Sequence, residues 1–559
     1  MAVDLQPELR PSRGAQAEGT TARVRTLDVL FVMRSLHYLR FFQTVLELLA
    51  ERGHRVRLLL ESRRHGQREQ AWLERMLERE NFTCEVANHF TGRHPARMRA
   101  IRYDLEHVRS LDPAFVWAQG RRKRAKKRFV RRPVARLAKL PLVRRPVGLR
   151  ALNRTLTVLD RVLPVPREAA AYLDRVRPDV LALSDDGAPG SLHSTYVRAA
   201  KARGIPTAIC VASWDNLGTR QQLRDVPHAL LVWNSKQVRE ATEIHGVPPE
   251  RVHATGAPNF DQWFSWQPRP RDEFLAKVGL DRDRPFVLWV GGALYRDSSP
   301  QTEAEYAVAW VARLRASTDG DLRELGVLLR PHPYRLSDWR AVDVSGLGNT
   351  VIWPRADLTM PVDDQQKADY YDSIFHSAVV VGMNTSAMIE ASIVGRPVLA
   401  VIEPDFEDSQ LGTFHFRYLL ESSGGAVREA RSAADSLVQL RALLDGDDEV
   451  ARRAREFVHE FVRPHGLERP AAPIFVETLE RLATPVAAER DPLWVVAARP
   501  AVLVGFWASD LVRAVRARLR LTELRLLAAA RVRRVAKRAR HVFFVSLAAV
   551  RARIQPGAR

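Results

Sequence analysis

Hydroxyl side chains stand where a short apolar run gives way to a helical pattern in the stretch 378–397. Val379–Val381 predict a buried parallel strand, Asn384 and Thr385 belong to the turn, and Ser386 opens the helix. The first backbone N–H groups of a helix have no partner within it, and that end carries positive charge, so such a turn can bind a phosphate. An ordinary turn capped by Thr385 or Ser386 is the alternative.

Three further residues are predicted to reach the same place. Glu390 lies one helical turn beyond Ser386, and its carboxylate can accept hydrogen bonds from the two hydroxyls of a ribose. The strand 326–329 ends in Arg330 and His332, which emerge beside the hydroxyl turn if the two strands are neighbours. A guanidinium, an imidazole and a helix start would together stabilise a departing phosphate. For His332, which stands between two prolines, the alternative is a structural role in its loop.

A pair of carboxylates marks the first half of the chain. The strand 180–183 is followed by Asp185 and Asp186, and two close carboxylates raise the pKa of one of them, which suits a general base near neutral pH. His37, after the first strand, could orient a sugar or act as a base. Capping of turns or helix starts is the alternative role for these residues. Candidates for the acceptor side follow the strand 207–211, and they are Trp214, Asp215 and Asn216.

Strands and helices alternate along most of the chain, which predicts parallel α/β domains. No G-x-G-x-x-G stands at the first strand-to-helix turn, so a dinucleotide clamp is not expected there. Residues 68–110 are predicted to be helical. A second set begins with the strand 286–290, followed by Gly291 and Gly292, whose small size would let a ligand or the opposite domain come close. The first strand, helix and strand are expected at 27–33, 36–52 and 56–60.

The predicted fold class is therefore α/β, with two tandem Rossmann-like domains, a basic helical insertion and a basic helical tail. Prolines at both ends of the stretch between the two sets mark a linker. The expected division is a disordered lead-in at 1–25, a first domain at 26–265 with the insertion at about 113–159, a linker at 266–284, a second domain at 285–483 and a tail at 484–559.

The formal net charge of +22 is concentrated in two segments. Residues 113–159 contain 15 Lys and Arg and no Asp or Glu, and residues 498–559 contain 15 Lys and Arg with two acidic residues, so the rest of the chain is mildly acidic. Apolar side chains alternate with these cations, which suits an anionic membrane surface. Nucleic acid is a less favoured partner, because no reader module or series of stacking aromatics is evident. A solvated basic insertion is the third interpretation.

Composition also bears on the cellular compartment. Cys84 and Cys210 are the only cysteines, which argues against a disulfide framework and fits a reducing cytosol. No apolar segment near residue 1 qualifies as a signal peptide. The apolar stretch 495–512 is a poor membrane span, because Arg499, Pro500 and Asp510 interrupt it. We therefore expect a cytoplasmic protein that is peripheral at the inner face of the plasma membrane.

The order of these motifs resembles that of GT-B glycosyltransferases, over roughly residues 26–483 without the insertion. Asp185-Asp186-Gly187, His332-Pro333 and Thr385-Ser386 look like the motifs of bacterial capsule sialyltransferases and of CDP-glycerol glycerophosphotransferases. The sialyltransferases have paired serines where this chain has Thr385 first, so the resemblance leaves the donor open. Thr255–Asp261 resembles a segment of UDP-N-acetylglucosamine 2-epimerases, which share the fold.

This resemblance implies a role for each motif. One of the two aspartates would activate the acceptor, and His332 would assist the departing nucleotide phosphate. The hydroxyl turn would bind that phosphate, and Glu390 would hold the ribose. The donor-binding set would comprise Arg330, Gly291, Gly292, Asn384, Thr385, Ser386 and Glu390. No metal and no cofactor are expected, because no clear Asp-x-Asp strand end is present and a helix end with cationic neighbours can hold a diphosphate.

The expected function is transfer of a glycosyl or glycerophosphate group from a nucleotide-activated donor to a cell-envelope polysaccharide or lipid-linked acceptor. Two other functions remain open. A UDP-N-acetylglucosamine 2-epimerase-like enzyme would need no lipid acceptor, and the basic segments argue against it. A non-catalytic protein that binds membranes or nucleic acid would keep the same scaffold without the chemistry.

Overall fold

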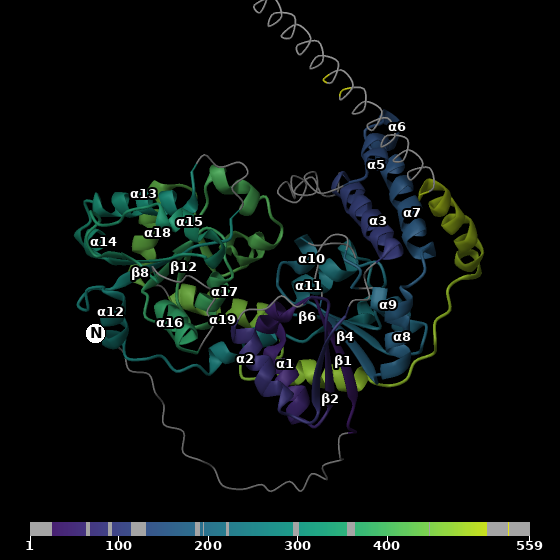
Figure 1. Ribbon diagram of the computed structural model, residues 1–559. Coiled ribbons are helices and arrows are strands. Elements are labelled where there is room, and N and C mark those ends of the chain that lie inside the picture. Colours follow the sequence, from purple (N-terminus) through teal and green to yellow (C-terminus); the bar gives the residue numbers. More distant parts are fainter. Residues whose placement is uncertain are drawn as a thin grey trace, which may run out of the picture.

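The computed structural model describes residues 25–62, 67–87, 92–112, 130–184, 191–193, 195–219, 223–294, 301–354, 364–446, 448–510, 531 and 535. Within these residues the chain forms two parallel β-sheets in tandem (Figure 1). The first has seven strands in the order β3-β2-β1-β4-β5-β6-β7, and the second has six in the order β10-β9-β8-β11-β12-β13. The strand order of each sheet reverses beside its first strand, as in doubly wound folds. This confirms the predicted pair of tandem Rossmann-like domains.

The first domain contains the seven-stranded sheet and the helices that cover its two faces. Its strands are β1 (Asp28–Met33), β2 (Arg55–Leu60), β3 (Phe82–Val86), β4 (Val180–Ser184), β5 (Thr207–Cys210), β6 (Ala229–Val232) and β7 (Val252–Ala254). Its helices are α1 (Leu39–Glu51), α2 (Gln67–Leu77), α3 (Arg93–Ser110), α5 (Arg132–Leu137), α6 (Pro141–Arg144), α7 (Pro146–Val162), α8 (Arg167–Val176), α9 (Thr195–Lys201), α10 (Asn216–Thr219) and α11 (Ser235–Arg239).

The second domain is built in the same way around the six-stranded sheet. Its strands are β8 (Phe286–Val290), β9 (Gly326–Arg330), β10 (Thr350–Ile352), β11 (Val379–Gly382), β12 (Val398–Val401) and β13 (Val427–Ala430). After the helices of the first domain, the chain forms α12 (Arg271–Val278), α13 (Glu303–Arg315), α14 (Gly320–Glu324), α15 (Leu336–Arg340), α16 (Asp364–Phe375), α17 (Ala387–Ile393), α18 (Ala433–Asp445), α19 (Asp448–Phe461) and α20 (Ala471–Leu482).

Apolar periodicity explains where these elements form. Every residue of β4, β5 and β6 is buried, as expected for strands that helices cover on both faces. In α1 the apolar side chains recur at helical spacing and all are buried, as the sequence predicts; they are Leu39, Phe42, Val45, Leu46 and Leu49.

Three segments differ from the sequence-based expectations. The helical prediction for 68–110 is wrong at β3, an edge strand that pairs with β2 and has a polar residue at every second position. The expected linker contains α12, because Phe274 and Val278 pack into the core of the second domain. Finally, α20 lies within the segment assigned to the second domain, but its apolar face packs against α1 in the first.

Parts of the two basic segments are described. The insertion forms α5, α6 and α7 from residue 131 onwards, whereas 113–129 lie outside the described residues, as does the lead-in up to residue 24. In the tail, a helix spans Leu493–Asp510, and most residues beyond it are not described. By length and composition this helix is the one stretch, among the described residues, that could cross a membrane.

The two domains meet along an apolar seam, where Trp214, Trp233 and Trp263 of the first domain join the core of the second. Several hydrogen bonds cross the seam. In two of them Ala257 N–H donates to the Val462 carbonyl at 2.9 Å, and the Asn234 side-chain amide donates to the Phe461 carbonyl at 2.8 Å. Near the seam, His415 and Tyr418, which follow β12 in the chain, contact Trp214 and Glu240 of the first domain.

Candidate functional site

The carboxyl edge of the second sheet gathers most of the predicted donor-binding residues. Strand β8 pairs with β9 on one side and with β11 on the other, so Arg330 and the hydroxyl turn are not on adjacent strands. Gly291 and Gly292 follow β8 and lie between them. The register sets Val290 opposite both Arg330 and Gly382, which brings the three strand ends level with one another.

The two glycines make this close packing possible. A Cβ atom on Gly291 would lie 2.9 Å from the His332 backbone nitrogen, and one on Gly292 would lie 2.6 Å from the Asn384 carbonyl oxygen. Both distances are too short for a side chain, so the turns after β8, β9 and β11 touch only because these residues are glycine. The space that the sequence suggested for a ligand is therefore used, at these two positions, by neighbouring backbone of the same domain.

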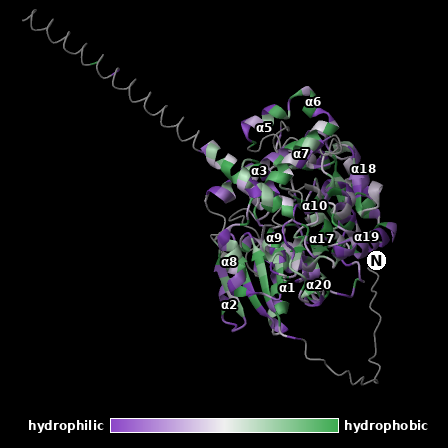
Figure 2. Ribbon diagram, turned by 90° about the vertical axis from the view of Figure 1, so that its right-hand side faces the viewer, coloured by the Kyte–Doolittle hydropathy of each residue, from purple (hydrophilic) through white to green (hydrophobic). Residues whose placement is uncertain are grey.

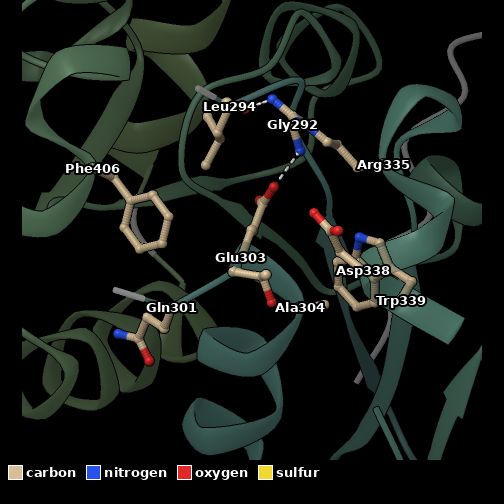
Figure 3. Close-up of a pocket in the computed structure, with 10 residues that line it drawn as sticks. Gly292, Leu294, Gln301, Glu303, Ala304, Arg335, Asp338, Trp339 and Phe406 are labelled. Carbon is tan, nitrogen blue, oxygen red and sulfur yellow. Dashed lines mark hydrogen bonds between the residues drawn. The ribbon is translucent and has the colours of Figure 1, made fainter. Parts of the chain in front are cut away.

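A buried carboxyl group fixes the glycine turn from behind. Glu303 opens α13, and its Oε2 accepts a hydrogen bond from the Gly292 N–H at 2.8 Å (Figure 3). Burial raises the pKa of Glu303 to about 8, although the N–H groups of Gly292 and Trp289 oppose the rise. A cavity of about 10 Å³, lined by Arg335, Asp338 and Trp339 among others, adjoins this group and has room for about one water molecule.

Arg330 is a mostly buried cation without an ion-pair partner among the described residues. Its guanidinium lies 5.3 Å from the ring centre of Trp353 and 4.9 Å from that of Tyr370. The Nη1 atom is sealed from solvent and finds no hydrogen-bond partner within the described ranges of the chain. Burial lowers the pKa of Arg330 to about 10, and the negative charges of neighbouring groups, Asp369 and Glu390 among them, offset only part of the lost hydration. Such a group favours the binding of an anion.

Glu390 shares this environment, as the sequence predicts. Tyr370 donates a hydrogen bond from its hydroxyl to Glu390 Oε2, and Arg330 lies near enough to affect the carboxyl electrostatically. Burial raises the pKa of Glu390 to about 7, while these two neighbours oppose the rise. Near neutral pH the carboxyl is therefore present in both forms, and its second oxygen is available to a hydroxyl group.

His332 is neutral in this structure and presents one N–H group. Its Nδ1 accepts a hydrogen bond from the Tyr334 backbone N–H at 3.1 Å, which assigns the imidazole proton to Nε2. Burial, together with the positive charges of Arg40 and Arg335, lowers the pKa of His332 to about 4. Arg40 is an exposed residue of α1, so this effect reaches His332 from the opposite domain.

In the hydroxyl turn, more polar groups are already hydrogen-bonded within the protein than the sequence suggests. Thr385 Oγ1 accepts a weak hydrogen bond from the Ala387 N–H at 3.4 Å, and the N–H groups of Met388 and Ile389 are bonded to the carbonyls of Thr385 and Ser386. Asn384 donates its side-chain amide to the Ser409 carbonyl. Ser386 is exposed and its side chain caps nothing, so its hydroxyl is the most accessible group of the turn.

The residues predicted for the first domain, unlike those of the second, are not brought together at one place. Asp185 and Asp186 lie outside the described residues, directly after the last residue of β4. His37 is mostly exposed and its Nδ1 lies 3.2 Å from a carboxylate oxygen of Glu69. Trp214 is buried in the domain seam, where its ring stacks edge-on against His415 at 4.7 Å.

Of the other two acceptor-side candidates, Asp215 lies near a carboxyl group that the sequence did not single out, that of Glu240. Asn216 is fully buried, and the Asp215 carboxylate lies near enough to raise the pKa of Glu240. Glu240 starts a π-helical turn, and its Oε1 lies 3.2 Å from the Tyr418 hydroxyl of the second domain. Burial is the main reason that the pKa of Glu240 rises to about 8. The sequence signal here is weak, because a lone Glu in a helix usually faces solvent.

No group of three or more His, Cys, Asp or Glu is placed to hold a metal ion, as far as the described part of the chain goes.

Comparisons with known proteins give matches among solved structures alone. No family model matches the sequence, and no curated protein matches it. The chain is similar to a UDP-GlcNAc 2-epimerase from Neisseria meningitidis bound to UDP-GlcNAc, at 12% identity and a TM-score of 0.45, over 81% of this chain and 99% of the other. A glycosyltransferase from Rickettsia africae matches at 10% identity and a TM-score of 0.44, over 82% and 99%. The wall teichoic acid polymerase TagF matches at 10% and 0.40, over 81% and 88%. At these values the matches assign no activity and no substrate to this chain.

Proposed function

We propose that this protein transfers a glycosyl or glycerophosphate group from a nucleotide-activated donor to a polysaccharide or lipid-linked acceptor of the cell envelope, at the inner face of the plasma membrane. The observation that carries the proposal is Arg330, whose buried guanidinium has an N–H group without a partner among the residues that the structure describes. A nucleotide phosphate supplies the anion that this group lacks, and a guanidinium binds phosphate through several hydrogen bonds at once.

The neighbours of Arg330 suit the rest of a nucleotide. Glu390, hydrogen-bonded to Tyr370, offers its second oxygen to the ribose hydroxyls. Ser386 adds an exposed hydroxyl from the turn after β11. We assign the donor to the second domain on these grounds, with all charge stabilisation coming from protein side chains.

In the proposed reaction, the bond between the transferred group and the nucleotide phosphate breaks while an acceptor hydroxyl oxygen forms the new bond. Negative charge grows on the departing phosphate, where Arg330 and the Nε2–H of neutral His332 can stabilise it. Arg40 adds positive charge from the first domain. The acceptor hydroxyl loses its proton to a carboxylate, a role that we assign to Asp185 or Asp186 from their position after β4.

Epimerisation is the rival reaction. The segment Thr255–Asp261 resembles part of the epimerases, but here Asp261 has a structural role, because it accepts hydrogen bonds from the backbone of Ala471 and Ala472 and pairs with Arg463. No observation on the described residues favours epimerisation over transfer.

The test is product analysis with the purified full-length chain. UDP-, CDP-, CMP- and GDP-activated donors are supplied with and without a lipid-linked saccharide acceptor, and released nucleotide is measured. We expect release from one donor that depends on the acceptor and falls roughly a hundredfold in His332→Ala, because one hydrogen-bond donor to the departing phosphate is lost. His459→Ala, at an exposed histidine of α19, is the matched control. An epimer formed from UDP-N-acetylglucosamine alone would overturn the proposal, as would the absence of turnover with every donor.

A further inference from the structure

The helix Leu493–Asp510 presents an uncharged apolar face to solvent. Just 6% of its length is buried. The exposed side chains include Leu493, Trp494, Val504 and Trp507, with exposed fractions between 49% and 88%. One continuous stripe runs along this face at helical spacing, and the two tryptophans lie along its two edges. The stripe consists of Leu493, Ala497, Pro500, Val504 and Ala508. The helices of soluble proteins place polar and charged residues on such a face.

The opposite face of this helix is fixed to the first domain. Val495 is buried, and Leu503 and Phe506 pack against the core beneath α3 and α7. Arg499, the single charged residue between Leu493 and Ser509, turns inward, where it pairs with Asp491 at 2.6 Å and donates to the Val162 carbonyl at 3.1 Å. An ion pair between Arg97 of α3 and Asp510 attaches the last residue of the helix to the first domain.

The insertion helices beside it add exposed apolar side chains and positive charge. Figure 1 shows the helix beside α7, with α5 and α6 at the outer end of the same group, and Figure 2 shows these two helices at the outer end from a second side. Leu140, Leu142 and Val147 are 50%, 73% and 71% exposed. The basic residues Arg132, Arg136, Lys139, Arg144 and Arg145 have no carboxylate partner in the described part of the chain.

We propose that the helix Leu493–Asp510 and the outer end of α5–α6 together form a docking face for an anionic lipid bilayer, on which the helix lies in the plane of the interface. Apolar side chains would enter the boundary between headgroups and acyl chains, tryptophan rings would sit at the level of the headgroups, and the arginines would pair with lipid phosphates. Unpaired cations next to exposed leucines match such a surface in both charge and polarity. This docking is independent of the reaction proposed above.

An in-plane helix fits the contacts better than a spanning one. Spanning would carry Arg499 to mid-bilayer and separate it from Asp491, and Leu503 and Phe506 would leave the core. At 1.5 Å per residue, 18 residues extend about 27 Å, slightly less than the hydrocarbon thickness of a bilayer. Lying flat keeps every inward contact and covers only the outward stripe.

A cysteine scan of the full-length chain tests this geometry. Burial raises the pKa of Cys84 to about 12 and raises that of Cys210 as well, so an introduced exposed cysteine can be labelled selectively near pH 7. An environment-sensitive fluorophore is attached to a single introduced cysteine at each of four stripe positions: Leu493, Ala497, Val504 and Ala508. A fifth variant carries it at the inward Val502, and Val438→Cys on α18 is the equally exposed control.

Vesicles of phosphatidylcholine with about a third phosphatidylglycerol serve as the probe, compared with phosphatidylcholine alone. We expect a blue-shifted emission at the four stripe positions with anionic vesicles, and none at Val502 or Val438. Similar shifts all along the helix, graded by depth, would indicate a spanning helix and overturn the proposal. No shift at any position would overturn it too.

Binding strength gives a second, independent readout. Replacing Trp494 and Trp507 together with serine removes two exposed rings and no core contact, so the fold is expected to persist. The vesicle partition coefficient should fall at least about tenfold, whereas Val438→Ser should leave it unchanged. Binding should also weaken with added salt. Tight binding to duplex DNA with none to anionic vesicles would contradict the proposal.

Discussion

Arg330, Tyr370 and Glu390 act as one electrostatic unit at the scale of single residues. Burial lowers the pKa of the guanidinium to about 10 and raises that of the carboxyl to about 7, so each charge is held less favourably than in water. Tyr370 lies between them and bonds the carboxyl. A phosphate beside Arg330 would restore the missing partner, which makes the unit better suited to binding an anion than to stabilising the empty fold.

His332 gives a residue-scale prediction about pH. Its pKa is about 4 in the unliganded protein because of burial and two nearby arginines. A bound nucleotide brings negative charge next to the ring and should raise the pKa of His332 by about one or two pH units. Histidine ring resonances, titrated by NMR with and without UDP or CDP, measure this, and the His332 signal is identified by its loss in His332→Gln. An identical titration at saturating nucleotide would count against a phosphate at this position.

The sequence located the residues of the second domain that directly follow strands or begin helices. Arg330 and His332 end an apolar run, and Glu390 is one turn along a predicted helix, so local pattern is enough to place them. Tyr370 and Arg40 could not be found in this way. They reach the site from a neighbouring helix and from the opposite domain, and only tertiary packing brings them there.

At the scale of elements, strands were predictable where both faces are buried. Runs such as β8 and β11 are apolar throughout, whereas β3 and β13 lie at sheet edges and mix polar residues with apolar ones. The register also corrects one expectation about the site, because β8 separates β9 from β11. The glycine pair that follows β8 then matters for backbone packing, which sequence pattern alone does not reveal.

Glu303 supports that glycine turn and should make stability depend on pH. Its pKa in the folded protein is about 8, well above that of an exposed carboxyl, so the folded state holds the proton more tightly than the unfolded state. The corresponding stability is fully present below about pH 4.5 and is lost as the pH rises through 8. Glu303→Gln keeps an acceptor for the Gly292 N–H and cannot ionise.

We therefore expect the free energy of unfolding, measured by urea denaturation, to decline less steeply between pH 5 and pH 8 in Glu303→Gln than in the parent. Some decline should remain, because burial also raises the pKa of Glu240 and of Glu390. Glu468→Gln, at an exposed position, is the matched control. Equal slopes in all three proteins would show that the buried carboxyl does not titrate as described.

At the scale of the whole molecule, α20 ties the two domains together. Asp261, in the connection between the sheets, accepts hydrogen bonds from the first N–H groups of α20 and pairs with Arg463. Arg52 and His54 of the first domain both reach Glu480 at the other end of the helix. The last helix of the domain pair thus closes the seam from the side of the first sheet.

Removing the Asp261 side chain, which caps the start of α20, should loosen the seam without unfolding either sheet. Asp261→Ala leaves the buried Arg463 unpaired and is expected to lower the free energy of unfolding by roughly 2 to 4 kcal/mol. Hydrogen exchange, followed by mass spectrometry, should become faster in α20 and in α1, which it covers. Asp283→Ala, at an exposed loop position, should change neither quantity. Unchanged exchange in α20 would mean that Asp261 does not hold the helix.

The most direct test of the central claim is calorimetric titration of UDP and CDP into the parent protein and into Arg330→Met, with Arg340→Met at an exposed position as the control. Methionine keeps an apolar stem between Trp353 and Tyr370 and removes the buried charge. The account predicts that the parent and the control bind at least one of the two nucleotides. It also predicts that Arg330→Met binds that nucleotide at least about tenfold more weakly while its thermal stability is equal or higher. Equal affinity in Arg330→Met and the parent, or no binding of either nucleotide to the parent, would contradict it.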